Sequence, residues 1–137
     1  MPAPSPPKRV LFVCVENSNR SQMAEGFARA LGGADIQAFS AGSRPSGQIN
    51  PRALQMMAER GIALDSQRSK SLDEIGDDPF DAVVTMGCGD ACPWVAAIRR
   101  IDWALQDPKT LDDDGFRSVR DDIERRVKAL LDELRRS

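Results

Sequence analysis

The segment RVLFVCV, residues 9–15, is a short and continuous apolar run that is rich in valine. Runs of this kind are typical of strands that are buried on both faces of a parallel sheet. After a polar segment, apolar residues recur at helical spacing over residues 20–31, and Gly32 and Gly33 stop the pattern. A strand, a loop and a helix in this order predict an α/β fold.

The rest of the chain continues the alternation of strands and helices. Residues 35–40 and 81–86 are predicted as strands, and the alternating residues 99–106 as an edge strand with one face exposed to water. Residues 51–60 are predicted as a helix, and SLDE at 71–74 as the capping box of a short helix. A long C-terminal helix is indicated by an apolar stripe that comprises Phe116, Val119, Ile123, Val127, Leu130 and Leu134.

This alternation implies parallel strands that are joined by right-handed crossovers. The expected fold class is therefore α/β, with a three-layer arrangement of a four-stranded parallel sheet and helices on both of its faces. The 137 residues suffice for one such domain, which is expected to span residues 8–137. Residues 1–7 are rich in proline and are expected to form a disordered tail.

Composition excludes several classes of partner. Basic and acidic residues nearly balance, with a formal net charge of −2, so no footprint for nucleic acid is expected. No apolar stretch reaches the length of a membrane span and the first residues do not resemble a signal peptide, so a cytoplasmic protein without a membrane partner is expected. The chain has three cysteines and no histidine, which predicts reduced thiols and excludes a histidine base for a nucleophile.

Three reactive residues follow the ends of predicted strands. Cys14 ends the first strand, Cys88 follows the third, and Asp107 follows the fourth. In parallel sheets of this size, ligands bind beyond the carboxyl ends of the strands, where the strand order reverses. The topology therefore predicts that these residues gather at one sheet edge, although an Asp-Pro pair such as Asp107-Pro108 is also an ordinary turn opener.

The residues that follow Cys14 are predicted to form an oxyanion-binding loop. None of them is proline, so every backbone N–H is available as a donor, and the next helix adds the positive end of its dipole. Arg20 can close the ring with its planar guanidinium, which can bind two oxygens at once. The loop comprises Val15, Glu16, Asn17, Ser18, Asn19 and Arg20.

Cys14, at the floor of this loop, is a candidate nucleophile. The positive field of the loop is expected to favour its thiolate form and so to replace the missing histidine. Ser21 can donate a hydrogen bond to the thiolate, and Asn17 can hold the loop through its amide. A buried cysteine at a strand end is also a common core residue, and the Cys14 to Arg20 spacing alone does not decide between the two interpretations.

The segment CVENSNRSQMAEGFAR, residues 14–29, resembles the signature loop and first helix of the three-cysteine, thioredoxin-coupled arsenate reductases. These enzymes share the fold of the low-molecular-weight protein tyrosine phosphatases. The resemblance continues through FSAGSRP, DAVVTMGCGDACP, DWALQDPK and VRDDIERRV. It implies that Cys14 is the nucleophile, Arg20 the oxyanion ligand and Asp107 the general acid. By the same resemblance, Ser21 stabilises the thiolate and Asn17 organises the loop.

Cys88 and Cys92 lie in MGCGDACPW, whose glycines and aspartate favour an exposed turn. Two interpretations stay open on local grounds, a pair of ordinary core cysteines or a redox pair, and the spacing allows a mutual disulfide. A zinc site needs four ligands, which three cysteines without histidine do not supply. We therefore expect no metal and no cofactor.

The resemblance implies a series of thiol exchanges. Cys14 attacks arsenate, or another small tetrahedral oxyanion, to form a covalent adduct while Asp107 protonates the leaving oxygen. Cys88 then attacks Cys14 and arsenite leaves. Cys92 attacks Cys88, and thioredoxin or a similar thiol protein reduces the Cys88–Cys92 disulfide. Weak phosphatase activity is expected beside this reaction, because phosphate and arsenate are nearly identical anions.

Two other functions stay open on the sequence. A low-molecular-weight protein tyrosine phosphatase would use the same nucleophile and acid, although Lys109 stands where that family typically carries a tyrosine. A non-enzymatic arsenite or redox sensor would use the thiols without turnover. In some relatives a potassium ion steadies the loop through positions that match Asn17, Glu25 and Ser40. Lys70 takes the place of a further acidic ligand, so no potassium requirement is expected.

Overall fold

The computed structural model describes residues 6–76, 78–87 and 95–136 of the chain. Its sheet consists of β1 (Lys8–Cys14), β2 (Ile36–Gly42), β3 (Phe80–Thr85) and β4 (Ala97–Asp102). All neighbouring strands are parallel, and their order is β2-β1-β3-β4. The expected four-stranded parallel sheet is therefore confirmed, and the strand order reverses between β1 and β3.

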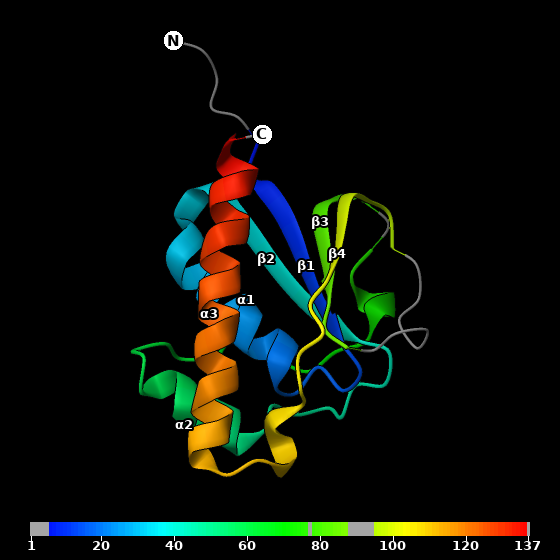
Figure 1. Ribbon diagram of the computed structural model, residues 1–137. Coiled ribbons are helices and arrows are strands. Elements are labelled where there is room, and N and C mark those ends of the chain that lie inside the picture. The colour runs from blue at the N-terminus through cyan, green and yellow to red at the C-terminus, as the bar shows by residue number, and fades with distance from the viewer. Residues whose placement is uncertain (1–5, 77, 88–94, 137) are drawn as a thin grey trace.

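Helices cover both faces of this sheet. Figure 1 shows the three α-helices together on one side, namely α1 (Arg20–Gly32), α2 (Pro51–Ala58) and α3 (Asp113–Arg136). The other side carries the short 3-10 helix η2 (Leu72–Glu74), whose Leu72 packs against that face. Two further 3-10 turns, η1 (Gly33–Asp35) and η4 (Pro108–Thr110), connect the main elements. The expected three-layer α/β class is confirmed.

The central strand β1 divides its side chains between two cores. Val10, Phe12 and Cys14 pack into the larger core with the three α-helices, whereas Leu11 and Val13 pack into the smaller core on the other face. Alternate residues of a strand point to opposite faces, so a strand covered on both sides must be apolar throughout. Burial of each large side chain contributes about 1.5–3 kcal/mol to folding, which anchors the strand that ends at Cys14.

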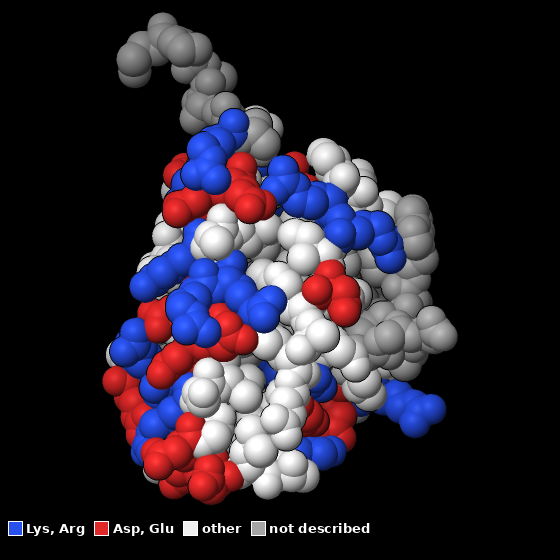
Figure 2. All heavy atoms as spheres, in the orientation of Figure 1, with Lys and Arg blue, Asp and Glu red and all other residues white. Residues whose placement is uncertain are grey.

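The long helix α3 presents its apolar stripe to the larger core and its charges to solvent. Of the predicted stripe, Val119 is partly buried and the other members are fully buried. In Figure 2, basic and acidic side chains are interspersed over the face of the molecule that α3 occupies. Pairs such as Arg125–Asp122 and Lys128–Glu124 link these charges along the helix. Among the described helices, none has the length and apolarity needed to cross a membrane.

The helix caps form at the predicted residues. Asn50 Oδ1 accepts a 3.0 Å hydrogen bond from the Arg52 N–H and Pro51 is the first residue of α2. Ser71 and Glu74 make the reciprocal hydrogen bonds of a capping box at η2. Side-chain caps satisfy N–H groups that a helix start leaves without partners, which is why local sequence predicted both positions.

The edge strand differs from its predicted range. Residues 99–106 were expected as a strand, but β4 covers Ala97–Asp102. The Trp103 N–H still donates to Thr85 O at 2.8 Å, and then the Leu105 N–H turns back to Trp103 O, also at 2.8 Å. Trp103 and Leu105 nevertheless remain buried in the core. The alternation of apolar residues therefore extends beyond the end of β4, because alternation indicates which side chains are buried and not which residues pair in the sheet.

Candidate active site

A small pocket lies at the carboxyl end of β1, in front of the loop that leads into α1. Its volume is about 130 Å³. Cys14, Arg20 and Asp107 all line it, although they come from separate parts of the chain. The complete lining is Cys14, Val15, Glu16, Ser18, Asn19, Arg20, Asp107 and Lys109. Cys88 and Cys92 lie outside the described residues.

The backbone of the loop turns its carbonyl groups away from the pocket. Val15 O, Glu16 O and Ser18 O accept hydrogen bonds of 2.8–3.2 Å from the neighbouring segment 44–50. In a trans peptide the C=O and the following N–H point in opposite directions, so the N–H groups after these carbonyls face the other way. Within the described part of the chain, the N–H groups of residues 16–19 have no acceptor. The loop therefore offers several backbone donors to an anion.

Two backbone features allow the loop to wrap so tightly. Asn17 has a φ of 51°, in the left-handed region that asparagine tolerates better than most residues. Gly42, at the end of β2, lies directly against the loop, and a Cβ there would be only 2.5 Å from Val15 O. Any other residue at position 42 would push the loop away from the sheet, so glycine is required by close approach.

The Arg20 guanidinium is held from one side. Its Nη1 donates to Met86 O at 2.7 Å and to Leu105 O at 2.9 Å, and the residue is 8% exposed. Its Nε is buried and has no acceptor among the described residues. Nε and Nη2 together form the edge of a guanidinium that binds two oxygens of one anion. Because Nη1 is anchored to backbone carbonyls, this edge is left for a ligand.

A chain of hydrogen bonds reaches the sulfur from behind the loop. Cys14 Sγ lies 2.8 Å from Ser21 Oγ, and Ser21 Oγ accepts a 2.8 Å hydrogen bond from Asn17 Nδ2. Asn17 Oδ1 in turn accepts from Gln22 Nε2 and from the Lys70 N–H, both at 2.9 Å. Asn17 and Ser21 are fully buried. They do not line the pocket and contact the sulfur side of the loop instead.

Asp107 lines the pocket from the start of η4. Its Oδ1 accepts hydrogen bonds from Asn19 Nδ2 at 3.4 Å and from the Lys109 N–H at 3.1 Å, the second of which caps η4. Its Oδ2 is 3.9 Å from Arg20 Nη2. The side chain is 33% exposed. One carboxylate oxygen is thus fixed by donors, while the other stays near the anion-binding edge of Arg20 and within reach of solvent.

Lys109 lines the pocket and was not included among the predicted site residues. It follows Asp107 by two positions in the same turn, and its Nζ is 3.5 Å from Glu16 Oε1. The sequence contained one signal for it, a cation in the turn that carries the predicted acid. The carbonyls of Met86 and Leu105 that hold Arg20 had no signal, because every residue carries a carbonyl group.

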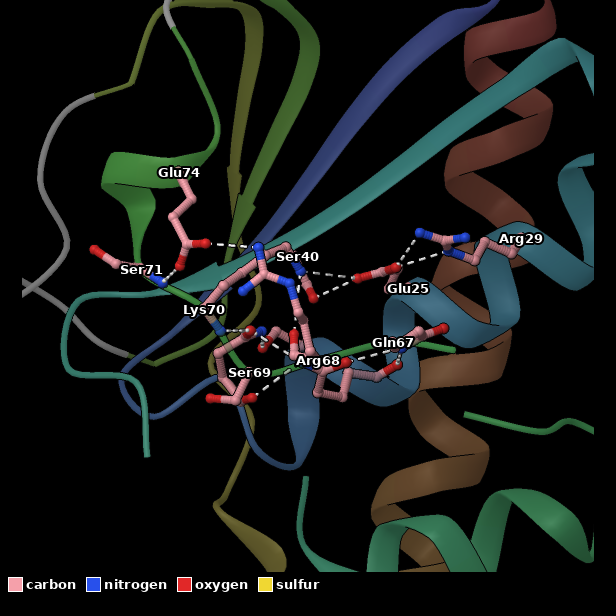
Figure 3. Close-up of polar contacts among 12 residues, drawn as sticks. Glu25, Arg29, Ser40, Gln67, Arg68, Ser69, Lys70, Ser71 and Glu74 are labelled. Carbon is pink, nitrogen blue, oxygen red and sulfur yellow. Dashed lines mark hydrogen bonds and ion pairs between the residues drawn. The ribbon is translucent and has the colours of Figure 1, made fainter. Parts of the chain in front are cut away.

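Behind the loop, a buried carboxylate is surrounded by cations and a hydroxyl (Figure 3). Glu25 is 1% exposed; its Oε1 accepts from Ser40 Oγ at 2.5 Å and lies 3.7 Å from Lys70 Nζ. Its Oε2 pairs with Arg29 at 2.6 Å. Burial lowers the pKa of Lys70, and the nearby Glu25 carboxylate partly opposes this shift. The Lys70 ammonium and the Ser40 hydroxyl thus both approach the same oxygen, Oε1, of the Glu25 carboxylate.

These contacts bear on the potassium ion that the resemblance raised. Glu25 Oε1 and Asn17 Oδ1 already accept hydrogen bonds from protein donors, and the Lys70 ammonium lies beside the first of them. A second cation in this space would face the repulsion of the lysine charge. The residues present therefore do not fit a resident potassium ion.

Comparison with known proteins places this geometry in a family context. The family model described as low molecular weight phosphotyrosine protein phosphatase matches residues 9–137. A glutaredoxin arsenate reductase from Synechocystis sp. is 41% identical over 90% of this chain and 96% of its own length. A solved structure of an arsenate reductase in the phosphate binding state superposes with a TM-score of 0.85 at 40% identity, covering 92% of this chain and 98% of the other. A thioredoxin-dependent arsenate reductase from Corynebacterium glutamicum has a TM-score of 0.80 at 32% identity, covering 97% of this chain and 64% of the other.

Proposed function

The chain belongs to the low molecular weight phosphotyrosine protein phosphatase family, and within it we propose that this protein is an arsenate reductase that uses Cys14 as its nucleophile. The observation that carries the proposal is the placement of Cys14 Sγ in a small pocket with the Nε and Nη2 edge of Arg20 and with Asp107. The names of relatives at 40% identity and above support arsenate as the oxyanion.

The first step joins sulfur to arsenic. The arsenate oxygens bind to the loop N–H groups and to Nε and Nη2 of Arg20, which stabilises the charge that builds up in the transition state. The Cys14 thiolate forms an S–As bond while one As–O bond breaks. The oxygen leaves as water after it takes a proton from Oδ2 of Asp107. Ser21 donates a hydrogen bond to the thiolate and so stabilises the attacking sulfur.

The second step transfers electrons. The Cys88 thiolate attacks Cys14 Sγ, so that an S–S bond forms, the S–As bond breaks, and its electron pair stays on arsenic. Arsenic(V) thereby becomes arsenic(III) and arsenite leaves. The Cys92 thiolate then attacks Cys88, which frees Cys14 and leaves a Cys88–Cys92 disulfide. Two thiols are oxidised for each arsenate that is reduced, and an external dithiol closes the cycle.

The partner is a thiol protein of a reducing compartment such as the cytoplasm. One relative is named for glutaredoxin and another for thioredoxin, so both chemistries occur among proteins of this kind. The same pocket supports slow hydrolysis of phosphate esters as a side reaction, because Cys14, Arg20 and Asp107 serve both reactions. Phosphorus has no comparably accessible lower oxidation state, so phosphate cannot complete the redox step.

Steady-state production of arsenite tests the proposal. Purified protein is supplied with arsenate and NADPH, in one arm with thioredoxin and thioredoxin reductase and in the other with glutaredoxin, glutathione and glutathione reductase. We expect many turnovers in at least one arm and none with Cys14→Ser. A wild type that binds arsenite but never turns over in either arm would show a sensor, and one that only hydrolyses esters would show a phosphatase.

A further inference from the structure

An ion pair spans the mouth of the pocket. Lys109 Nζ lies 3.5 Å from Glu16 Oε1, and both residues line the pocket although they come from separate elements, η4 and the loop after β1. We propose that this pair is the specificity element of the pocket, which admits free inorganic oxyanions and disfavours esters that carry an organic group. The inference rests on the proposed function of the pocket as an oxyanion site.

The pair is poorly suited to stabilise the fold. The Lys109 and Glu16 side chains are 50% and 42% exposed, and exposed ion pairs contribute about 0–1 kcal/mol to stability. The position of the pair in the pocket lining points instead to an effect on which ligands bind. A carboxylate at the entrance of an anion pocket repels the ligand, and the Lys109 ammonium neutralises that repulsion. Lys109 therefore allows Glu16 to lie at the mouth without excluding anions.

Both partners project from anchored backbone. Glu16 O accepts hydrogen bonds of 3.0 Å from the Ser46 N–H and from Ser69 Oγ. The Lys109 N–H donates to Asp107 Oδ1 at 3.1 Å, and its carbonyl accepts from Arg52 at 3.4 Å. The two side chains are about half exposed, but the backbone from which each one projects is held by hydrogen bonds. The bridge across the mouth is thus a consequence of how the loop and η4 are held.

The size of the pocket gives this bridge its effect. At about 130 Å³, the pocket is well below the roughly 300–1,000 Å³ of sites for drug-sized organic ligands. A free tetrahedral anion fits inside. An ester must direct its organic group out through the mouth, where it meets the pair. Binding an ester therefore requires the pair to open, whereas binding an inorganic anion does not.

Calorimetric titration with inorganic phosphate and with phenyl phosphate tests the inference without any redox step. For the wild type we expect inorganic phosphate to bind about threefold to fivefold more tightly than phenyl phosphate, because opening an exposed ion pair costs at most about 1 kcal/mol. In the double variant Glu16→Ala/Lys109→Ala the two affinities should become nearly equal. Lys109→Ala alone should weaken the binding of both ligands, because the Glu16 carboxylate is then uncompensated.

The matched control is Arg99→Ala/Glu133→Ala, which removes an exposed ion pair of 2.7 Å between β4 and α3, outside the pocket lining. This control should keep the wild-type ratio of affinities. A wild type without a preference for inorganic phosphate, or a double variant that keeps the preference, would overturn the inference. Arsenite production is measured separately, so a protein that selects inorganic phosphate but reduces no arsenate would reject the proposed function alone.

Discussion

Ser21 Oγ lies 2.8 Å from Cys14 Sγ, across the loop that joins β1 to α1. A thiolate has no hydrogen to donate, so once Cys14 is ionised Ser21 must be the donor. The amide of Asn17 donates to the same hydroxyl oxygen at 2.8 Å, which leaves the hydroxyl hydrogen free to point at the sulfur. Asn17 is itself held by Gln22 and by the Lys70 backbone. The buried amide therefore orients the group that stabilises the thiolate.

Ser21→Ala removes this donor, and we expect the rate of Cys14 alkylation by iodoacetamide at neutral pH to fall. Hydrogen bonds to charged groups contribute about 1.5–3 kcal/mol, so arsenate reduction at neutral pH should slow by about tenfold to a hundredfold. The matched control is Ser46→Ala, whose hydroxyl lies at an exposed turn. An unchanged alkylation rate in Ser21→Ala would show that the loop alone maintains the thiolate.

Arg20→Lys keeps the charge but loses the two-donor edge. A lysine has no Nη1 to hold the carbonyls of Met86 and Leu105 while it binds an anion. We expect the affinity for phosphate, measured by calorimetry, to fall by about tenfold or more, because at least one hydrogen bond to a charged group is lost. Arg44→Lys, outside the pocket lining, should bind phosphate like the wild type. Equal affinities in both variants would mean that the anion does not bind at this edge.

The order of the thiol exchanges predicts different fates for two cysteine variants. Cys92→Ser should reduce one equivalent of arsenate and then stop with a disulfide between Cys14 and Cys88. The reductant must reach a sulfur atom, and Cys14 is buried at 2% exposure. Cys88→Ser should fail in the first turnover, because no internal thiol attacks the adduct.

Peptide mapping under non-reducing conditions after arsenate treatment identifies these disulfides. The wild type without arsenate is the control and should yield none of them. Sustained turnover by Cys92→Ser with thioredoxin would contradict the relay and indicate a mechanism with two cysteines.

The surroundings of Lys70 predict that potassium is unnecessary. Its ammonium lies 3.7 Å from the buried Glu25 carboxylate, so replacing sodium by potassium should change neither activity nor Tm of the wild type. Lys70→Gln removes that charge and should create a potassium-dependent rise in Tm, measured by differential scanning calorimetry. Lys128→Gln, on the exposed face of α3, is the matched control. A rise of several degrees in the wild type would reveal an ion site despite the lysine.

Glu59, at the end of α2, pairs with Arg117 and Arg120 of α3, and these pairs are expected to make the stability of the fold depend on pH. Its hydrogen bonds with Arg117, and then with Arg120, lower the pKa of Glu59 from 4.5 to about 2. Because its pKa is lowered in the folded state, Glu59 stabilises the fold at pH values above the ordinary pKa of 4.5, and this contribution is lost as the pH falls toward 2. The Tm difference between the wild type and Glu59→Gln should therefore be largest near neutrality and narrow below about pH 4.5.

Salt provides the check on this prediction. Because the Glu59 and Arg117 side chains are partly exposed, about 1 M salt should screen the pair and narrow the Tm difference at neutral pH. A Tm difference that stays constant from neutral pH down to about pH 2 would show that Glu59 stabilises the fold through packing and not through its charge.

Much of the fold was predictable because its determinants are local. The apolar run of β1, the cap at Asn50 and the stripe of α3 each act within a few neighbouring residues, and the structure contains all three elements. The end of β4 was not predictable in this way. Trp103 and Leu105 continue the apolar alternation beyond the end of β4. The alternation indicates which side chains are buried, whereas the end of a strand is set by hydrogen bonds to its neighbour, which form only in the packed chain.

The sequence by itself determined the order of strands and helices, and with it the position of Cys14 between a buried strand and a helix start. Only the tertiary structure decided which partners meet that loop. Lys109 lies 93 positions from Glu16, and the carbonyls that hold Arg20 are 66 and 85 positions away. Such contacts depend on strand register and on how loops pack at the sheet edge. No local pattern in the sequence predicts them, because hydrogen-bond partners that are distant in sequence come together only when the elements that carry them have packed.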